Sequence, residues 1–308
     1  MIVLPIFLLL SFPAWANDFS FSLEARTGLR FGLTNEYVYE GNRQISRLEW
    51  DENFVPYIHT ALNFYWRQFF VGGAVSFAIP VQSGEKRNFD YFLPNSNALT
   101  HFSRHNAFLD RHNNFDISFG YKFDRGSWFI RPSIGFTYSN RKWTGMDGYL
   151  QYAAPGTALQ GDEPIDLVTG PVITYELRIS YFYAAIGFGY RLLNNRLTLG
   201  VLVQFNPYIW AEALDHHILR ATEFLDIMHG GIGGRLHLTV SYKPRTLDNF
   251  ELFTGFTFEK LRKTLGNSAR RSVGVNTPPA FVPCSISRAG YDSRLWGVYM
   301  GIRVRVDF

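Results

Sequence analysis

The chain ends in LWGVYMGIRVRVDF, residues 295–308. From Trp296 to Phe308 every second residue is apolar, and the residues between them are glycine or charged, apart from Tyr299. A period of two is typical of a β-strand with one apolar and one polar face. The alternation runs through all 14 residues, whereas most strands of globular proteins have about 5–6. The stretch therefore predicts an unusually long strand with two unlike faces.

The same alternation recurs at residues 19–26, 115–123, 197–206 and 250–258. Long strands with one apolar face favour a transmembrane β-barrel, because closure leaves no backbone edge unpaired in lipid. A soluble β-sandwich is the alternative, but its strands would be shorter. The longest apolar block, residues 2–10, falls short of the about 20 residues of a transmembrane helix.

The connections between the predicted strands alternate between short and long. Strands are expected at residues 18–36, 43–66, 69–81, 113–123, 127–145, 170–192, 196–212, 232–243, 249–263 and 291–308. Long loops are expected at residues 82–112, 146–169, 213–231 and 264–290. An even number of antiparallel strands with this alternation is typical of outer-membrane barrels. We therefore predict an all-β fold, a ten-stranded antiparallel transmembrane β-barrel with periplasmic termini and long extracellular loops.

The N-terminus has the pattern of a signal peptide. An apolar segment ends at Pro13 and is followed by Ala14-Trp15-Ala16, which matches the small-x-small rule for signal-peptidase cleavage. A buried N-terminal strand is the alternative. We predict that residues 1–16 are a signal peptide and that residues 17–308 form a single barrel domain in the outer membrane of a bacterium.

Composition narrows the possible partners. The 308 residues carry a formal net charge of +4, which suits an anionic lipid surface, and no basic cluster suggests nucleic-acid binding. The single cysteine, Cys284, excludes an intrachain disulfide and a CxxC redox centre.

Six of the eight histidines fall in two of the predicted loops, 82–112 and 213–231. In the second loop, Asp215-x-His217 places a carboxylate and an imidazole on one face of an extended segment. Such a carboxylate can orient the imidazole and stabilise its charged form. Asp90, which follows Asn88 in the first loop, could face this pair and help to hold an attacking water. An isolated Asp-x-His is more often an ordinary surface motif.

Two other chemistries are less well supported. The imidazoles of His101, His105, His216 and His217 would suffice for zinc, but no HExxH motif is present, and an i,i+4 pair clamps a metal only on a helix. We therefore expect no metal. No Gly-x-Ser-x-Gly motif appears, and Ser103 has no such context, which argues against a serine nucleophile.

With these features in view, the sequence resembles the omptin family of ten-stranded outer-membrane endopeptidases over essentially the whole mature chain. Residues 34–39 (TNEYVY) and 45–50 (ISRLEW) are similar to the first hairpin of the family. Residues 103–105 (SRH) resemble a second-loop motif, and residues 210–217 resemble the segment that carries the Asp-x-His pair.

The resemblance implies a water nucleophile held at the extracellular rim between an Asp pair and a His–Asp pair. His217 would be the general base and Asp215 would orient it. Asp90 matches one member of the family's Asp-x-Asp pair, whereas the other position is Asn88. An amide can hydrogen-bond water but carries no charge, so this departure bears on activity.

The resemblance also implies some preference for basic substrate residues. Glu36 matches one acidic residue of the family's substrate pocket. The second acidic position falls on Ala213, and the adjacent Glu212 should point to the opposite face of the strand. We therefore expect a weaker or altered preference for Arg and Lys.

Lipopolysaccharide is the expected activator, with no other cofactor. Tyr138, Lys142 and Arg178 lie near the positions that hold it in the family, although Asn140 replaces an acidic residue. Ordinary contacts at the head-group level are the alternative role for these side chains.

Two further functions stay open at this stage. The barrel could be an omptin-like adhesin or surface-binding protein that Asn88 has made inactive. A passive pore is less favoured, because inward side chains such as Arg26, Arg303 and Arg305 leave little lumen in a ten-stranded barrel.

Overall fold

The structure is a computed structural model that describes residues 19–274 and 279–308. The predicted signal peptide, residues 1–16, lies outside the described residues. Within the described ranges no helix is long and apolar enough to cross a membrane. The strands are β1 (Phe19–Glu40), β2 (Arg43–Trp66), β3 (Phe69–Ala78), β4 (Val81–Asp90), β5 (His101–Tyr121), β6 (Phe123–Arg125), β7 (Trp128–Tyr152), β8 (Ile165–Leu167), β9 (Pro171–Leu192), β10 (Leu197–Asn206), β11 (Ile209–His217), β12 (Thr222–Gly230), β13 (Gly233–Tyr242), β14 (Phe250–Ser272) and β15 (Val282–Asp307).

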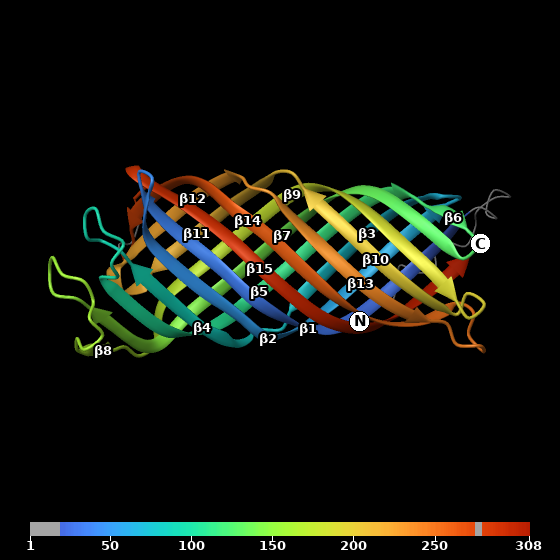
Figure 1. Cartoon of the computed structure of the whole chain (residues 1–308), viewed down its shortest axis with the longest axis horizontal. Coiled ribbons are helices and arrows are strands. Elements are labelled where there is room, and N and C mark those ends of the chain that lie inside the picture. The colour runs from blue at the N-terminus through green and yellow to red at the C-terminus, as the bar shows by residue number, and fades with distance from the viewer. Residues whose placement is uncertain (1–18, 275–278) are drawn as a thin grey trace.

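These segments form ten long antiparallel strands that close into a barrel, which confirms the predicted fold class (Figure 1). Four of these ten are each built from two shorter strands in line, namely β3 with β4, β5 with β6, β10 with β11, and β12 with β13. Pro80 and Pro207 lie at two of these breaks, where a missing backbone N–H interrupts the ladder. Pairing of β15 with β1 and of β7 with β9 completes the ring.

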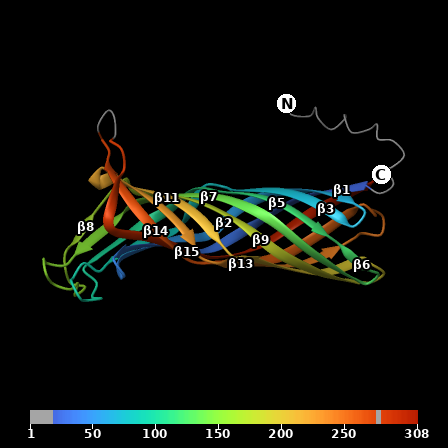
Figure 2. The same ribbon diagram turned by 90° about the horizontal axis from the view of Figure 1, so that it is seen from above.

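The two ends of the described chain meet at one end of the cylinder, which we call the terminal end. There the backbone N–H of Phe308 donates to the carbonyl oxygen of Phe19 at 3.0 Å. The opposite, distal end carries the turn between β11 and β12 and the hairpin with β8 (Figures 1 and 2).

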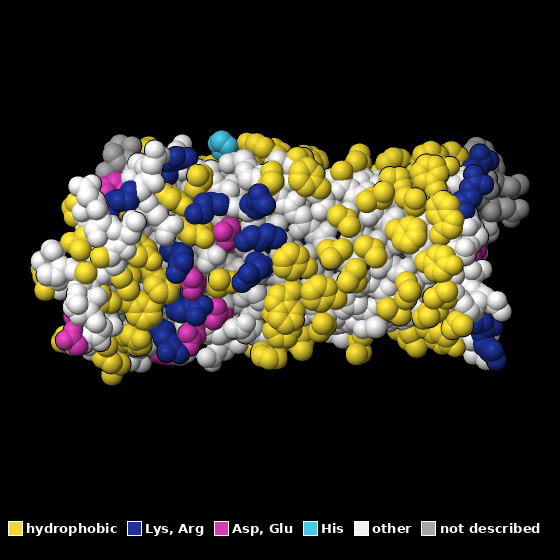
Figure 3. Space-filling model, in the orientation of Figure 1, with side chains coloured by type: hydrophobic (Ala, Val, Ile, Leu, Met, Phe, Trp, Pro, Cys, Tyr) yellow, Lys and Arg dark blue, Asp and Glu magenta, His cyan; other side chains and the backbone are white. Residues whose placement is uncertain are grey.

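The outer wall has an apolar belt on its terminal half. On β15 the alternate side chains Trp296, Val298, Met300 and Ile302 are exposed, as the C-terminal pattern predicts. On the face that Figure 3 shows, apolar side chains cover much of this half, and charged side chains gather toward the distal end. Lipid can solvate such a belt, whereas water would penalise it.

The strands continue well past the belt, which corrects the predicted loops at residues 82–112 and 213–231. Most of the first segment is β4 and the start of β5, and most of the second is the β11–β12 hairpin, closed by the short 3-10 helix η3 (Ile218–Arg220). All six histidines of these segments therefore lie on strands. The alternation of apolar and polar residues does not reveal these strands because, above the belt, outward positions carry charged residues such as Arg87.

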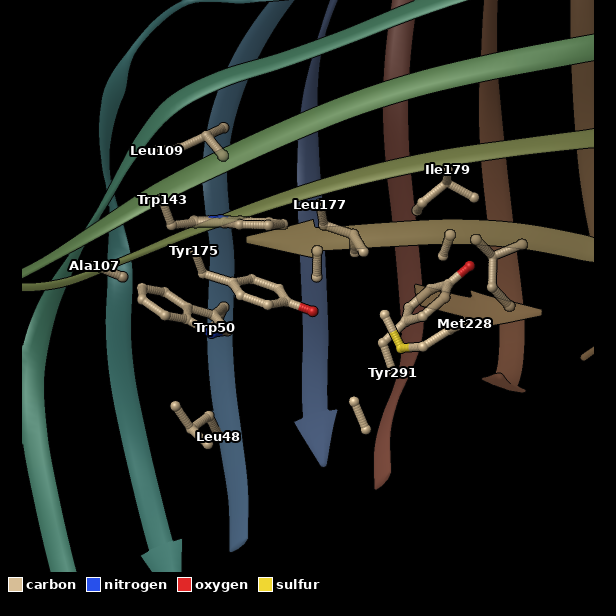
Figure 4. Close-up of a cluster of buried hydrophobic side chains, with 14 of the residues drawn as sticks. Leu48, Trp50, Ala107, Leu109, Trp143, Tyr175, Leu177, Ile179, Met228 and Tyr291 are labelled. Atoms are coloured by element: carbon tan, nitrogen blue, oxygen red, sulfur yellow. The ribbon is translucent and has the colours of Figure 1, made fainter. Parts of the chain in front are cut away.

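Aromatic side chains fill the lumen of the distal half. Trp50, Trp143 and Tyr175 from β2, β7 and β9 pack together, with Trp50 and Tyr175 stacked at a centroid distance of 5.9 Å (Figure 4). Closer to the terminal end, Glu259 accepts hydrogen bonds from Arg141 at 2.9 Å and from Arg235 at 2.5 Å. These side chains occupy the lumen between the distal mouth and the terminal end.

Candidate active site

One wall of the candidate site is the inward face of β4. Lys86, Asn88 and Asp90 alternate along this strand, so their side chains share one face. The intervening Arg87 points outward, where its Nη2 donates to Oδ1 of Asp51 at 2.9 Å. The walls on either side are β2 and β5, which both pair with β4.

Asp90 is held by hydrogen bonds on this wall. Nδ2 of Asn88 donates to Oδ2 of Asp90 at 3.0 Å, and the hydroxyl of Ser46 donates to Oδ1 of Asn88 at 3.1 Å. Burial raises the pKa of the Asp90 carboxyl, and the nearby Lys86 ammonium acts in the opposite direction. The amide therefore fixes the orientation of Asp90 without adding a second negative charge.

The opposite wall carries Asp215 and His217 on β11. Oδ2 of Asp215 lies 2.6 Å from Nε2 of His217, and the side-chain exposures are 4% and 24%. The carboxylate is thus enclosed while the imidazole still reaches the mouth. Since an ionised carboxylate only accepts, this contact places a proton on Nε2 and leaves Nδ1 with the lone pair of the neutral ring. Phe224 packs edge-on against the ring at 5.4 Å.

Glu36 lies between the two walls on β1, with only 2% of its surface exposed. Burial raises the pKa of its carboxyl well above the usual value, and the charges of Asp215 and Asp226 add to this increase. The Lys86 ammonium opposes it. Glu36 is therefore part of a shared acidic cluster, in a more enclosed setting than a rim residue.

Asp226 is a candidate that sequence reasoning missed. It lies on β12 directly opposite Ala213 of β11 and is buried. Burial, together with the charge of Asp215, raises the pKa of its carboxyl to about 7. The alternation of Phe224, Asp226 and Met228 is a sequence signal for an inward strand face, in a segment for which a loop is predicted. Asp226 thus supplies a carboxyl beside the position where the second pocket acid was expected.

Lys86 is the second missed residue and lies among the carboxylates of both walls. Its ammonium interacts electrostatically with Asp215, Asp90 and Glu36, in that order of strength. Burial lowers the pKa of Lys86 to about 8 despite these favourable charges. Arg220, in the turn after β11, also interacts with Lys86 and with Asp90. Lys86 is therefore within electrostatic reach of one predicted carboxylate on each wall, Asp90 and Asp215.

The predicted lipopolysaccharide residues lie on the outer wall, on β7 and β9. Tyr138 is 39% exposed, and Lys142 is the cross-strand neighbour of Glu176. Arg178 is already paired, with Oε1 of Glu176 at 3.0 Å and with Oε1 of Glu212 at 2.9 Å. The outward position of Glu212 agrees with the predicted strand faces.

The remaining histidines do not gather around a common point. His105 contacts the carbonyl oxygen of Asp147 through Nδ1 at 2.5 Å, and burial lowers its pKa to about 4. His216 and His217 are consecutive strand residues and face opposite ways. Within the described ranges no group of three or more His, Cys, Asp or Glu side chains could hold a metal ion.

The outer membrane protease OmpT has a similar architecture. The structure of the outer membrane protease OmpT from Escherichia coli superposes with a TM-score of 0.81 at 18% identity, covering 93% of this chain and 97% of that chain. The translocator domain of the autotransporter NalP from Neisseria meningitidis gives a TM-score of 0.35 at 9% identity, covering 92% and 88% of the two chains. No curated protein sequence matches the chain at a significant level.

A family model described as the Omptin family matches residues 17–302, which include both walls of the candidate site. The match extends over nearly all of the described barrel. The chain therefore belongs to the omptin family.

Proposed function

We propose that this chain is an endopeptidase of the bacterial outer membrane that hydrolyses peptide bonds with an activated water molecule. The observation that carries the proposal is the 2.6 Å contact between Asp215 and His217 on the wall opposite Asp90. Membership of the omptin family and the apolar belt support the location. OmpT, which shares the fold, is itself an outer membrane protease.

In the proposed reaction a water molecule lies between Asp90 and Nδ1 of His217. His217 takes one proton of the water as its oxygen attacks the peptide carbonyl carbon, and a tetrahedral oxyanion forms. Asp215 stabilises the imidazolium that results. The imidazolium then gives its proton to the leaving amine as the C–N bond breaks, which returns His217 to its starting state.

Asn88 acts in this scheme as a positioning residue. Its amide bridges Ser46 and Asp90, so it keeps the Asp90 carboxyl aimed by hydrogen bonds alone. A second carboxylate at this distance would repel Asp90, and the pair would have to share a proton. The amide therefore suits a single-carboxylate version of the site.

The substrate pocket has some preference for basic side chains. Glu36 supports this preference, and the carboxyl of Asp226 partly replaces the acid missing at Ala213. Both carboxyls have a raised pKa. They are therefore less negative at neutral pH than exposed carboxylates, and the preference is modest.

The active site faces the cell exterior, because the longer connections of outer-membrane barrels lie on that side. Residues 91–100 and 153–164 form such connections at the distal end. Lipopolysaccharide is the proposed activator, bound along Tyr138, Lys142 and Arg178 on the outer wall. The N-terminal signal peptide directs the single barrel domain to export.

A second candidate is a surface-binding protein that has lost catalysis, and Asn88 is the observation that favours it. Substitution Asn88→Asp separates the two functions. Activity in the natural protein supports the endopeptidase, whereas activity that arises only after Asn88→Asp supports the binding protein.

The proposal is tested with protein reconstituted in lipopolysaccharide-containing micelles and a library of quenched fluorescent peptides that include dibasic sites. We expect cleavage by the natural protein and its loss in His217→Ala. His216→Ala is the matched control, because this neighbouring histidine lies on the other strand face. Cleavage that survives in His217→Ala would refute the assignment, and a parallel assay without lipopolysaccharide tests the activator.

A further inference from the structure

We propose that Lys86 is a specificity-determining residue, a built-in cation beside Glu36 that shifts substrate selection from basic toward uncharged side chains. The inference rests on the proposed function and specifies the substrate class of the same site. It follows from the position of the Lys86 ammonium rather than from any motif in the sequence.

Lys86 is enclosed by the site and has little access to solvent. It is 3% exposed, and its cross-strand neighbours are Trp50 on β2 and His105 on β5. Its Nζ lies 3.5 Å from the hydroxyl of Ser103. The Lys86 side chain therefore cannot move out of the pocket to make room for a ligand without losing its interactions with the neighbouring carboxylates.

The surrounding carboxyl groups come from four different strands. Asp90 lies on the same strand as Lys86, Glu36 on β1, Asp215 on β11 and Asp226 on β12. Asp215, Asp90 and Glu36 make the largest favourable contributions to the Lys86 charge. Buried carboxylates are stable only when compensated, and Lys86 supplies part of that compensation from within the chain, although the pKa of Glu36 is still raised.

A substrate arginine or lysine would enter a site that already contains a cation. The incoming charge would be attracted by Glu36 and repelled by Lys86, and the enclosed setting strengthens both effects. The aromatic packing of Trp50 and Tyr175 below favours an apolar side chain instead. The net result is a pocket whose preference for a basic over an uncharged side chain is small.

The test compares peptides that differ only in arginine or norleucine on the pocket side of the cleaved bond. In Lys86→Met the ratio of kcat/KM for arginine over norleucine should rise at least about tenfold relative to the natural protein. Arg87→Met is the matched control, because it removes the same charge from the outward face of the same strand. The ratio should not change in this control.

A second variant tests the link with Glu36. In Lys86→Met/Glu36→Gln the gain for arginine should disappear, since the carboxyl that Lys86 had compensated is gone. An unchanged ratio in Lys86→Met, or a gain that persists in the double variant, would overturn the inference.

Measurements of peptide affinity test the inference even if the chain does not cleave peptides. The affinities of the same two peptides can be measured by fluorescence anisotropy in the His217→Ala background. We expect the arginine-to-norleucine affinity ratio to rise about tenfold when Lys86→Met is added. An unchanged affinity ratio refutes the inference, whereas absence of cleavage in the natural protein refutes only the proposed endopeptidase.

Discussion

Substitution Asp215→Asn tests the proposed chemistry most directly, because it keeps the shape of the side chain and removes its charge. In the natural protein the Asp215 carboxylate lies 2.6 Å from Nε2 of His217. During water attack the imidazole becomes positive, with its charge about 4 Å from the centre of that carboxylate. At an effective dielectric constant of about 20, two opposite unit charges at this separation attract by about 4 kcal/mol. The loss corresponds to about a 10³-fold lower kcat/KM.

The assay is the hydrolysis of a quenched fluorescent peptide in lipopolysaccharide-containing micelles. Glu212→Gln is the matched control, because Glu212 lies on the same strand but points outward and pairs with Arg178. It should stay close to the natural rate. A decrease of less than about tenfold in Asp215→Asn would refute the assigned role of the carboxylate. Thermal unfolding of each variant, monitored by circular dichroism, checks that the variant is folded.

Three further predictions concern the single carboxylate, the lumen and the pH dependence. Asn88→Asp should make the pH–rate profile more complex at acid to neutral pH, since two carboxyls 3.0 Å apart cannot both ionise easily; an unchanged profile contradicts this. Glu259→Ala should lower the free energy of unfolding by about 3–5 kcal/mol, because it leaves Arg141 and Arg235 uncompensated; a loss below about 1 kcal/mol in urea titrations would argue against the network. The pKa of Asp226 is raised to about 7, so its contribution to stability is full below pH 4 and is lost as pH rises through 7. The Tm of Asp226→Asn should therefore rise relative to that of the natural protein between pH 4 and pH 8, and the difference in their free energies of unfolding should change by about 4 kcal/mol. A Tm difference that stays constant over this range would disprove this.

The membrane-spanning part of the fold could be predicted because lipid imposes a simple rule. Where the outer face meets acyl chains, outward residues such as Val298 and Met300 must be apolar, and the period of two is visible. Above the belt, both faces of a strand can be polar. On β4 the outward Arg87 and the inward Asn88 are both polar, so the sequence no longer distinguishes strand from loop.

Part of the candidate site could be predicted for a similar reason. Asp215 and His217 are two residues apart, and their contact depends only on an extended backbone. The grouping of Lys86, Glu36 and Asp226 depends instead on barrel closure, which joins strands far apart in the chain. No local pattern contains that information, and a lysine flanked by arginine is usually taken for a solvated surface residue.

The strands extend past the apolar belt, and the resulting height of the candidate site above the membrane limits which polypeptides can reach it. From the edge of the belt to the candidate site, β11 advances by five steps, from Trp210 to Asp215, and β2 by eight steps, from Phe54 to Ser46. At about 3.3 Å per residue and a tilt near 40°, these stretches lift the reacting groups about 15 Å above the lipid. A polypeptide anchored in the same leaflet would need a tether of at least about five extended residues before its first bond came within range. The height of the scaffold thus excludes bonds that lie against the membrane surface and leaves those of freely diffusing or long-stalked chains.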